Sequence, residues 1–139
     1  MNEALLHEKV FDYYKKQKKT IFSEVPFMSR IIDLVILEEE EDITSYELKI
    51  KKWKYAIEQM KEHRIASSYC YLCMPGQSVS ERLVKKIVEE LTFYGFGFAL
   101  WDENLAMVKK VLPARKSEFL SKPVISRLKE DIKVLSCNR

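Results

Sequence analysis

Three charged residues stand inside two stretches that otherwise have the composition of buried β-strands. Asp33 interrupts the apolar run IIDLVIL, and Glu47 and Lys49 lie two residues apart in YELKI. Residues two apart on a strand project from the same face, so Glu47 and Lys49 should point the same way. The acidic run EEEED between the two stretches is expected to form a turn. A hairpin of suitable register would then bring Asp33 beside Glu47.

Two carboxylates beside an ammonium group are a costly arrangement without a purpose. The anions repel each other, and partial burial adds to the cost of keeping them charged. A divalent cation removes that cost, and Mg²⁺ binds through one or two carboxylates while water and substrate phosphate complete its coordination. The lysine could hold the attacking water and offset charge in the transition state of phosphate hydrolysis. The competing interpretation is a structural network of ion pairs at the strand ends, which contributes little to stability.

An Asp on one apolar strand, Glu-x-Lys on the next and a helix that carries a glutamine resemble the PD-(D/E)xK nuclease superfamily. The matching segments are RIID at 30–33, ELK at 47–49 and KYAIEQ at 54–59. The resemblance implies a restriction-endonuclease-like αβββαβ core and a Mg²⁺-dependent nuclease, with Mn²⁺ as a substitute. It also implies the roles of four residues: Asp33 and Glu47 bind the metal ion, Lys49 assists the hydrolytic water and Gln59 supports the site.

Three further positions extend this resemblance or depart from it. Glu24 is a candidate for the additional acid that some members place ahead of the Asp strand, and it would be a third metal ligand. Ile32 stands where the proline of the superfamily name would be. His63 stands four residues after Gln59, where some exonuclease-like members carry tyrosine, and we expect it at the surface. The alternative interpretation of Glu24 and Gln59 is that both are polar residues outside the site.

The hydrophobic periodicity predicts ten elements in the order αβββαβαββα, an α/β fold of mixed α+β character with helices flanking a mixed central sheet. Helices are expected over 2–18, 52–63, about 80–91 and from 123, and strands over 20–28, 30–37, 43–50, 67–74, 94–101 and 105–112. Short turns predict an antiparallel meander for the first three strands. The helix after the third strand predicts a right-handed crossover to a parallel fourth strand. Ser78 or Ser80 can cap the third helix.

The composition, with 47% apolar and 32% charged residues, is that of a soluble globular protein. A length of 139 residues predicts a single nuclease-like domain over 1–139. No apolar run approaches the roughly 18 residues that span a membrane. The first residues, MNEALLHEKVFDYY, do not show the basic region and apolar stretch of a signal peptide, so a cytoplasmic protein is expected. Three cysteines are an odd count, which argues against a disulfide framework. Cys70 and Cys73 should lie on opposite faces of a strand as core thiols.

Basic residues cluster in several places, although the net charge is only +3. Such clusters are either solvated faces or phosphate-binding surfaces. Those near the predicted site are expected to contact nucleic acid, with DNA as the expected substrate: Arg30, Lys51, Lys52 and Lys54. A chain of this length leaves little room for a specificity domain. Recognition of nucleic-acid structure, a homodimer and a targeting partner protein are therefore the open alternatives.

The alternative function is a non-catalytic module that retains the nuclease fold and binds nucleic acid or a partner protein. It predicts binding that depends on salt but not on Mg²⁺. The intact set of two acids and a lysine argues against it. A phosphohydrolase of small nucleotides is disfavoured because the sequence contains no Gly-rich phosphate loop. The sequence leaves open endonuclease or exonuclease action, DNA or RNA, and a role in repair, recombination, restriction or a mobile element.

Overall fold

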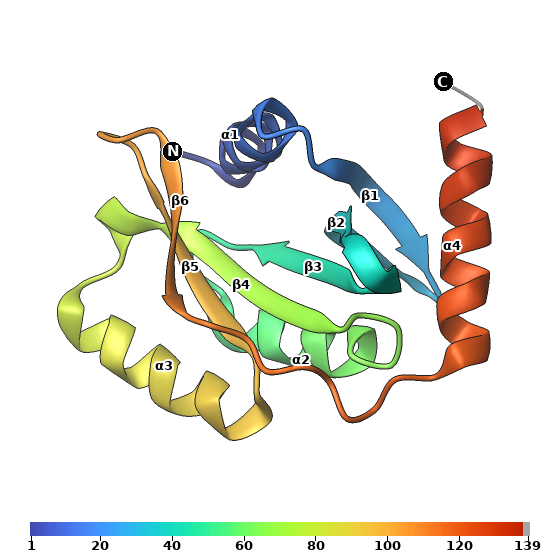
Figure 1. Cartoon of the computed structure of the whole chain (residues 1–139). Helices are drawn as coiled ribbons and strands as arrows, with labels where there is room; N and C mark the ends of the chain where they lie inside the picture. Colours follow the sequence, from blue (N-terminus) through green and yellow to red (C-terminus); the bar gives the residue numbers. More distant parts are fainter. Residues whose placement is uncertain (138–139) are drawn as a thin grey trace.

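The computed structural model describes residues 1–137 and contains a six-stranded mixed sheet flanked by helices (Figure 1). The elements are α1 (Glu3–Lys16), β1 (Thr20–Phe27), β2 (Arg30–Leu37), β3 (Ile43–Leu48), α2 (Trp53–His63), β4 (Tyr69–Pro75), α3 (Glu81–Tyr94), β5 (Gly97–Asp102), β6 (Met107–Leu112) and α4 (Lys122–Cys137), with 3-10 turns at Glu39–Glu41 and Gly76–Ser78. The predicted α/β class and the predicted order αβββαβαββα are confirmed.

The strands lie in the sheet in the order of the sequence, β1 to β6. The pairs β1–β2, β2–β3 and β5–β6 are antiparallel, whereas β3–β4 and β4–β5 are parallel. The predicted meander and parallel pair are therefore confirmed. The fifth strand begins three residues later than expected because α3 continues to Tyr94 and ends at Gly95, whose φ of 77° is a left-handed conformation that favours glycine.

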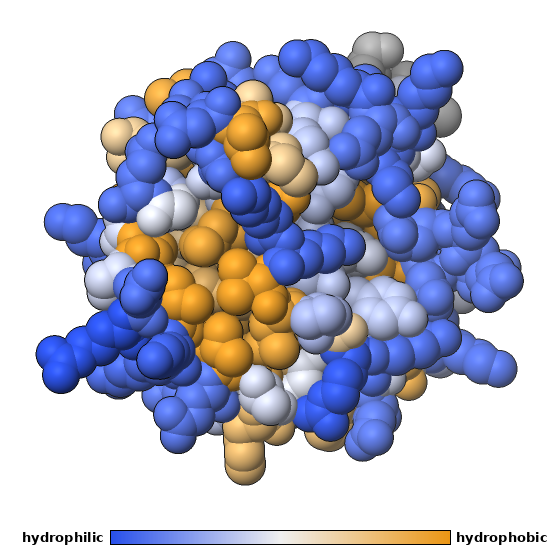
Figure 2. All heavy atoms as spheres, turned by 60° about the vertical axis from the view of Figure 1, so that its left-hand side comes forward, coloured by the Kyte–Doolittle hydropathy of each residue, from blue (hydrophilic) through white to orange (hydrophobic). Residues whose placement is uncertain are grey.

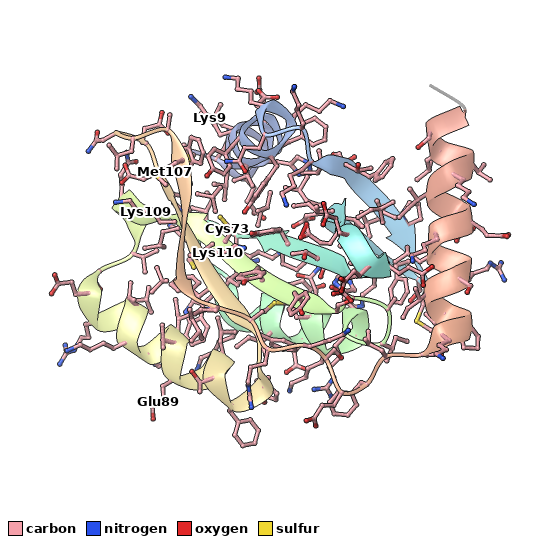
Figure 3. All side chains as sticks on the ribbon, viewed as in Figure 1. Lys9, Cys73, Glu89, Met107, Lys109 and Lys110 are labelled. Carbon is pink, nitrogen blue, oxygen red and sulfur yellow. The ribbon has the colours of Figure 1, made fainter. Side chains whose placement is uncertain are left out.

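The sheet is covered on both faces, and α4 lies beside β1 at one end (Figure 1). α1 packs on one face through Leu6, Val10 and Tyr14. α2 and α3 cover the other face. Cys73 belongs to the first core cluster and Cys70 to the second, so the two thiols lie on opposite faces, as predicted. Figure 3 shows Cys73 in the interior of the sheet. None of the helices described has both the length and the hydropathy to cross a bilayer.

The edge strand β6 and its neighbour α3 form the face that is turned forward in Figure 2. Apolar side chains gather there within a border of hydrophilic ones. Partly buried residues of this region pack against the second core cluster: Leu83, Val84, Val88, Leu100 and Leu112. Lys109 and Lys110 project from β6 (Figure 3). Lysines on an edge strand discourage pairing with the edge of another sheet.

The third helix begins at a side-chain cap, which resolves the choice between the two candidate serines. Ser80 Oγ accepts a hydrogen bond of 3.2 Å from the backbone N–H of Leu83. Ser78 instead donates to the carbonyl of Pro75. We expect Ser80→Ala to lower the free energy of unfolding by about 1 kcal/mol. Urea denaturation would measure this, with Ser80→Asp retaining the cap and the exposed Ser29→Ala as control. A loss for Ser29→Ala as large as that for Ser80→Ala would contradict the assignment.

Candidate active site

Asp33 lies where the hydrogen-bonded ladders on both sides of β2 are interrupted. Pairing of β1 with β2 runs up to Ser23–Leu34 and resumes at Val25–Ile32, which leaves Glu24 opposite Asp33. The β2–β3 ladder ends at Leu34–Tyr46, and its register continues to Asp33 opposite Glu47. Asp33 Oδ2 accepts a 2.9 Å hydrogen bond from the backbone N–H of Leu48. The expected juxtaposition of Asp33 with Glu47 is therefore present, at a point where the strands part.

The two carboxyl groups share a largely buried environment. Burial is the main reason that the pKa of Asp33 rises to about 7, and the nearby charge of Glu47 raises it further. Burial also raises the pKa of Glu47 to about 7, against smaller opposing effects of Asp33 and of the Lys49 charge. Near neutral pH, therefore, the protein keeps two poorly solvated carboxyl groups close to their point of ionisation. Such a pair is the arrangement that a bound cation stabilises.

Glu47 meets one polar side chain of α2, His63, in the interior. His63 is fully buried, and its Nδ1 lies 3.1 Å from Glu47 Oε1. The expectation of a surface position for His63 was wrong. Burial lowers the pKa of His63 to about 4, so the ring is neutral at pH 7. Gln59 and His63 are four residues apart and share one helix face, so this spacing was the signal that could have placed His63.

Several polar atoms of this cluster are buried without a hydrogen-bond partner among residues 1–137. They are both carboxylate oxygens of Glu47, Oε1 of Gln59 and both ring nitrogens of His63. The Glu47–His63 contact is thus close but not aligned as a hydrogen bond. An unsatisfied buried polar atom is costly, and native proteins seldom keep several together without a bound water, ion or ligand. The cluster is therefore a candidate ligand-binding position.

Lys49 follows the last residue of β3 instead of lying inside the strand as expected. Its backbone N–H still donates to the carbonyl of Cys73, at 3.1 Å, which fixes the direction of the side chain. The side chain is only 15% exposed, and its Nζ lies 3.9 Å from Glu3 Oε1. The same Nζ lies 5.2 Å from the centre of the Tyr55 ring. Lys49 is thus held at the mouth of the carboxyl pair by groups from α1 and α2.

Glu24 lies across from Asp33 and is exposed. Glu24 and Asp33 line the same surface depression, together with Glu3, His7 and Ser23. The backbone of Glu24 has a φ of 51°, the left-handed region that costs a non-glycine residue about 1–2 kcal/mol. Strain of this kind is often found at functional positions. Glu24 is therefore placed where a third carboxylate could reach a ligand of Asp33.

The predicted nucleic-acid contacts fall into two groups. Lys51, Lys52 and Lys54 are exposed and line a depression that also contains Lys49 and Glu3. This depression adjoins the acidic one, since Glu3 lines both. Arg30 instead forms an ion pair with Glu62 and donates to the Tyr55 hydroxyl at 3.2 Å. Within the described part of the chain, the three lysines have no acidic partner and could meet an anion beside Lys49, whereas Arg30 already has partners.

The donor set fits Mg²⁺ with few protein ligands. Among the residues described, no group of three or more His, Cys, Asp or Glu side chains is placed to hold a metal ion. Mg²⁺ needs less, because one or two carboxylates suffice when water and phosphate complete the octahedron. The oxygens of Glu47, unpaired among residues 1–137, and the adjacent carboxylate of Asp33 could serve as two such ligands.

Comparison with known proteins identifies the fold alone. No family model matches the chain, and no curated protein matches it. A solved structure, the SPO1766 protein of unknown function from Silicibacter pomeroyi, is similar with a TM-score of 0.66 at 14% sequence identity. The match covers 92% of this chain and 81% of that chain. The arrangement of elements is thus shared with another protein over nearly the whole chain.

Proposed function

We propose that this protein is a Mg²⁺-dependent nuclease with a restriction-endonuclease-like fold, which hydrolyses phosphodiester bonds of DNA in the cytoplasm. The observation that carries the proposal is the pair of the half-buried Asp33 and the buried Glu47 at the parting of β2 and β3, with Lys49 two residues beyond Glu47. Two carboxyl groups of raised pKa and a lysine at one strand end have little structural value. These three residues are the ones on which the sequence resembles the PD-(D/E)xK superfamily.

Each residue has a chemical task in this proposal. Asp33 and Glu47 would hold Mg²⁺, which supplies positive charge against the scissile phosphate when bound. Lys49 would orient the attacking water and offset charge that develops on the phosphate oxygens. His63 would limit the position of Glu47, and Gln59, whose Oε1 is buried, would support the site. The exposed lysines Lys51, Lys52 and Lys54 would hold neighbouring phosphates, an electrostatic contribution that weakens with salt.

Cleavage assays with Asp33→Asn test the proposal directly. Supercoiled plasmid, branched and single-stranded oligonucleotides would be incubated with Mg²⁺, Mn²⁺ or chelator. We expect metal-dependent cutting by the wild type and a loss of at least about 100-fold in Asp33→Asn, because a metal ligand is removed. Asp12→Asn, an exposed acid of α1, should cut like the wild type.

The opposite result is equally informative. Absence of cleavage of every substrate, together with failure of Mg²⁺ to bind by calorimetry, would overturn the proposal. Nucleic-acid binding that depends on salt and is indifferent to Mg²⁺ would then assign the chain to non-catalytic binding modules.

A further inference from the structure

A second pocket lies away from the carboxyl pair, at the opposite ends of the parallel strands. It is bordered by the last turns of α2 and α3, the starts of β4 and β5 and the segment 113–121 that leads to α4 (Figure 1). Backbone hydrogen bonds fix that segment in place: Arg115 N–H to Gly95, Ser117 N–H to Ser68 and Ser121 N–H to Ile65, at 2.8–2.9 Å. The pocket is therefore built by segments that are tied to one another.

Two guanidinium groups line this pocket without an acidic partner in ion-pair contact, as far as the described residues go. Arg115 Nη2 donates to the carbonyl of Thr92 at 2.9 Å, and its side chain makes no other hydrogen bond within residues 1–137. Gly95 supports this placement, because a Cβ there would lie 3.3 Å from Nε and Nη2 of Arg115. Arg64 stacks on the Phe119 ring at 3.9 Å. Planar, fixed guanidinium groups suit a phosphate and the face of a base.

Exposed aromatic rings stand at the same pocket. Phe93 is 80% exposed and Phe119 is 54% exposed, although phenyl rings are normally buried. Phe93 also meets the Tyr94 ring edge-on at 5.0 Å between centroids, which limits its motion. Exposed rings beside free arginines are the composition of stacking platforms for the bases of single-stranded nucleic acid.

The charge of the pocket favours an anion. Arg64, Arg115 and Lys116 line it against a single acid, Glu118. Lys116 is already paired with Asp42, at 3.2 Å, so the two arginines supply the available charge. The helix α2 runs from the depression lined by Lys51, Lys52 and Lys54, which also contains Trp53, to this pocket at Arg64. Its 11 residues span about 16 Å, the length of about five nucleotide steps.

We propose that this pocket binds one nucleotide of a single strand, with its base stacked on Phe93 or Phe119 and its phosphate on Arg64 and Arg115. The choice of nucleic acid as the ligand rests on the nuclease function proposed above. The shape and charge of the pocket are observed independently of that function. A strand held here and at Lys51, Lys52 and Lys54 would cross the protein along α2. The pocket thereby selects substrates that have an unpaired segment.

Fluorescence anisotropy with a labelled 12-nucleotide single strand tests this assignment, using the full chain in chelator so that no cleavage occurs. We expect Phe93→Ala to weaken binding by about 5- to 100-fold, since a stacking platform is removed. Phe93→Trp should retain the affinity. Arg115→Gln should weaken binding and reduce the slope of log affinity against log salt by about 1. The exposed residues Leu105 and Lys86 supply the matched controls Leu105→Ala and Lys86→Gln, which should bind like the wild type.

Two results would overturn the proposal. One is single-strand affinity that stays within twofold of the wild type in both Phe93→Ala and Arg115→Gln. The other is an equal loss for duplex and single strand, because a general phosphate surface would act on both. The binding assay contains no metal ion, so its outcome does not depend on catalysis. If Asp33→Asn cut nucleic acid like the wild type, the proposed nuclease activity would be wrong, but the binding result for the pocket would still stand.

Discussion

Lys49→Ala should reduce the single-turnover rate of cleavage by roughly 100- to 1,000-fold while Mg²⁺ still binds. The reason is that Lys49 Nζ is held at the mouth of the Asp33–Glu47 pair, where it can stabilise charge that appears only in the transition state. Removal of a positive charge near the metal ligands should leave the affinity for Mg²⁺ equal or slightly higher. Rapid-quench kinetics at saturating substrate and calorimetry with Mg²⁺ would measure the two quantities.

Two further variants make this result specific. Lys86→Ala removes an exposed lysine of α3 far from the pair and should cut at the wild-type rate. Lys51→Ala should weaken substrate binding and make it less dependent on salt. Its cleavage rate at saturating substrate should stay close to that of the wild type. Cleavage by Lys49→Ala at the wild-type rate would exclude the role given to this lysine.

The metal-free protein should lose about 2 to 3 kcal/mol of unfolding free energy between pH 6 and pH 8. Asp33 and Glu47, each with a pKa raised to about 7, bind protons more tightly in the folded chain than in the unfolded one. Their effect on stability is therefore most favourable at low pH and is lost as the pH rises through 7. His63, with a pKa lowered to about 4, acts in the opposite sense, but only below about 6.5.

Urea denaturation in chelator at pH 6, 7 and 8 would measure this loss. Asp33→Asn should reduce the dependence of the unfolding free energy on pH, because it removes one of the two groups that titrate. Asp12→Asn, at an exposed position, should leave that dependence unchanged. Addition of Mg²⁺ should stabilise the protein more at pH 8 than at pH 6, since protons compete with the metal ion for the same oxygens. Stability that stays level or rises from pH 6 to pH 8 would contradict the shared burial of the two carboxyl groups.

The sequence predicted the element order and the pairing of the first four strands correctly, because these follow from local patterns. Apolar runs mark the strands, and the acidic turn at 38–42 and Pro75-Gly76 mark strand ends, whatever the tertiary context. Element boundaries were less accurate. β3 ends at Leu48, so that Lys49 follows the strand, and α3 extends to Tyr94. These shifts depend on packing that periodicity does not describe.

The site was only partly accessible to sequence reasoning. Asp33, Glu47 and Lys49 were found because charged residues are unusual within apolar strands. His63 was misplaced: its spacing from Gln59 sets both residues on one helix face, but the direction of that face is decided by the packing of α2 on β3. The second pocket could not be predicted, since Arg64, Phe93 and Arg115 come together only through the path of residues 113–121.

The interruption of both ladders at Asp33 has a mechanical consequence. The β1–β2 hairpin joins the parallel half of the sheet through the pairs from Leu34–Tyr46 to Leu37–Ile43, and beyond them the backbones part. A cation held by Asp33 of β2 and Glu47 of β3 would link the two strands where their pairing ends. Loading of the metal and stiffening of the sheet would then be a single event, and the carboxylates could shift toward a substrate without breaking a strand pair.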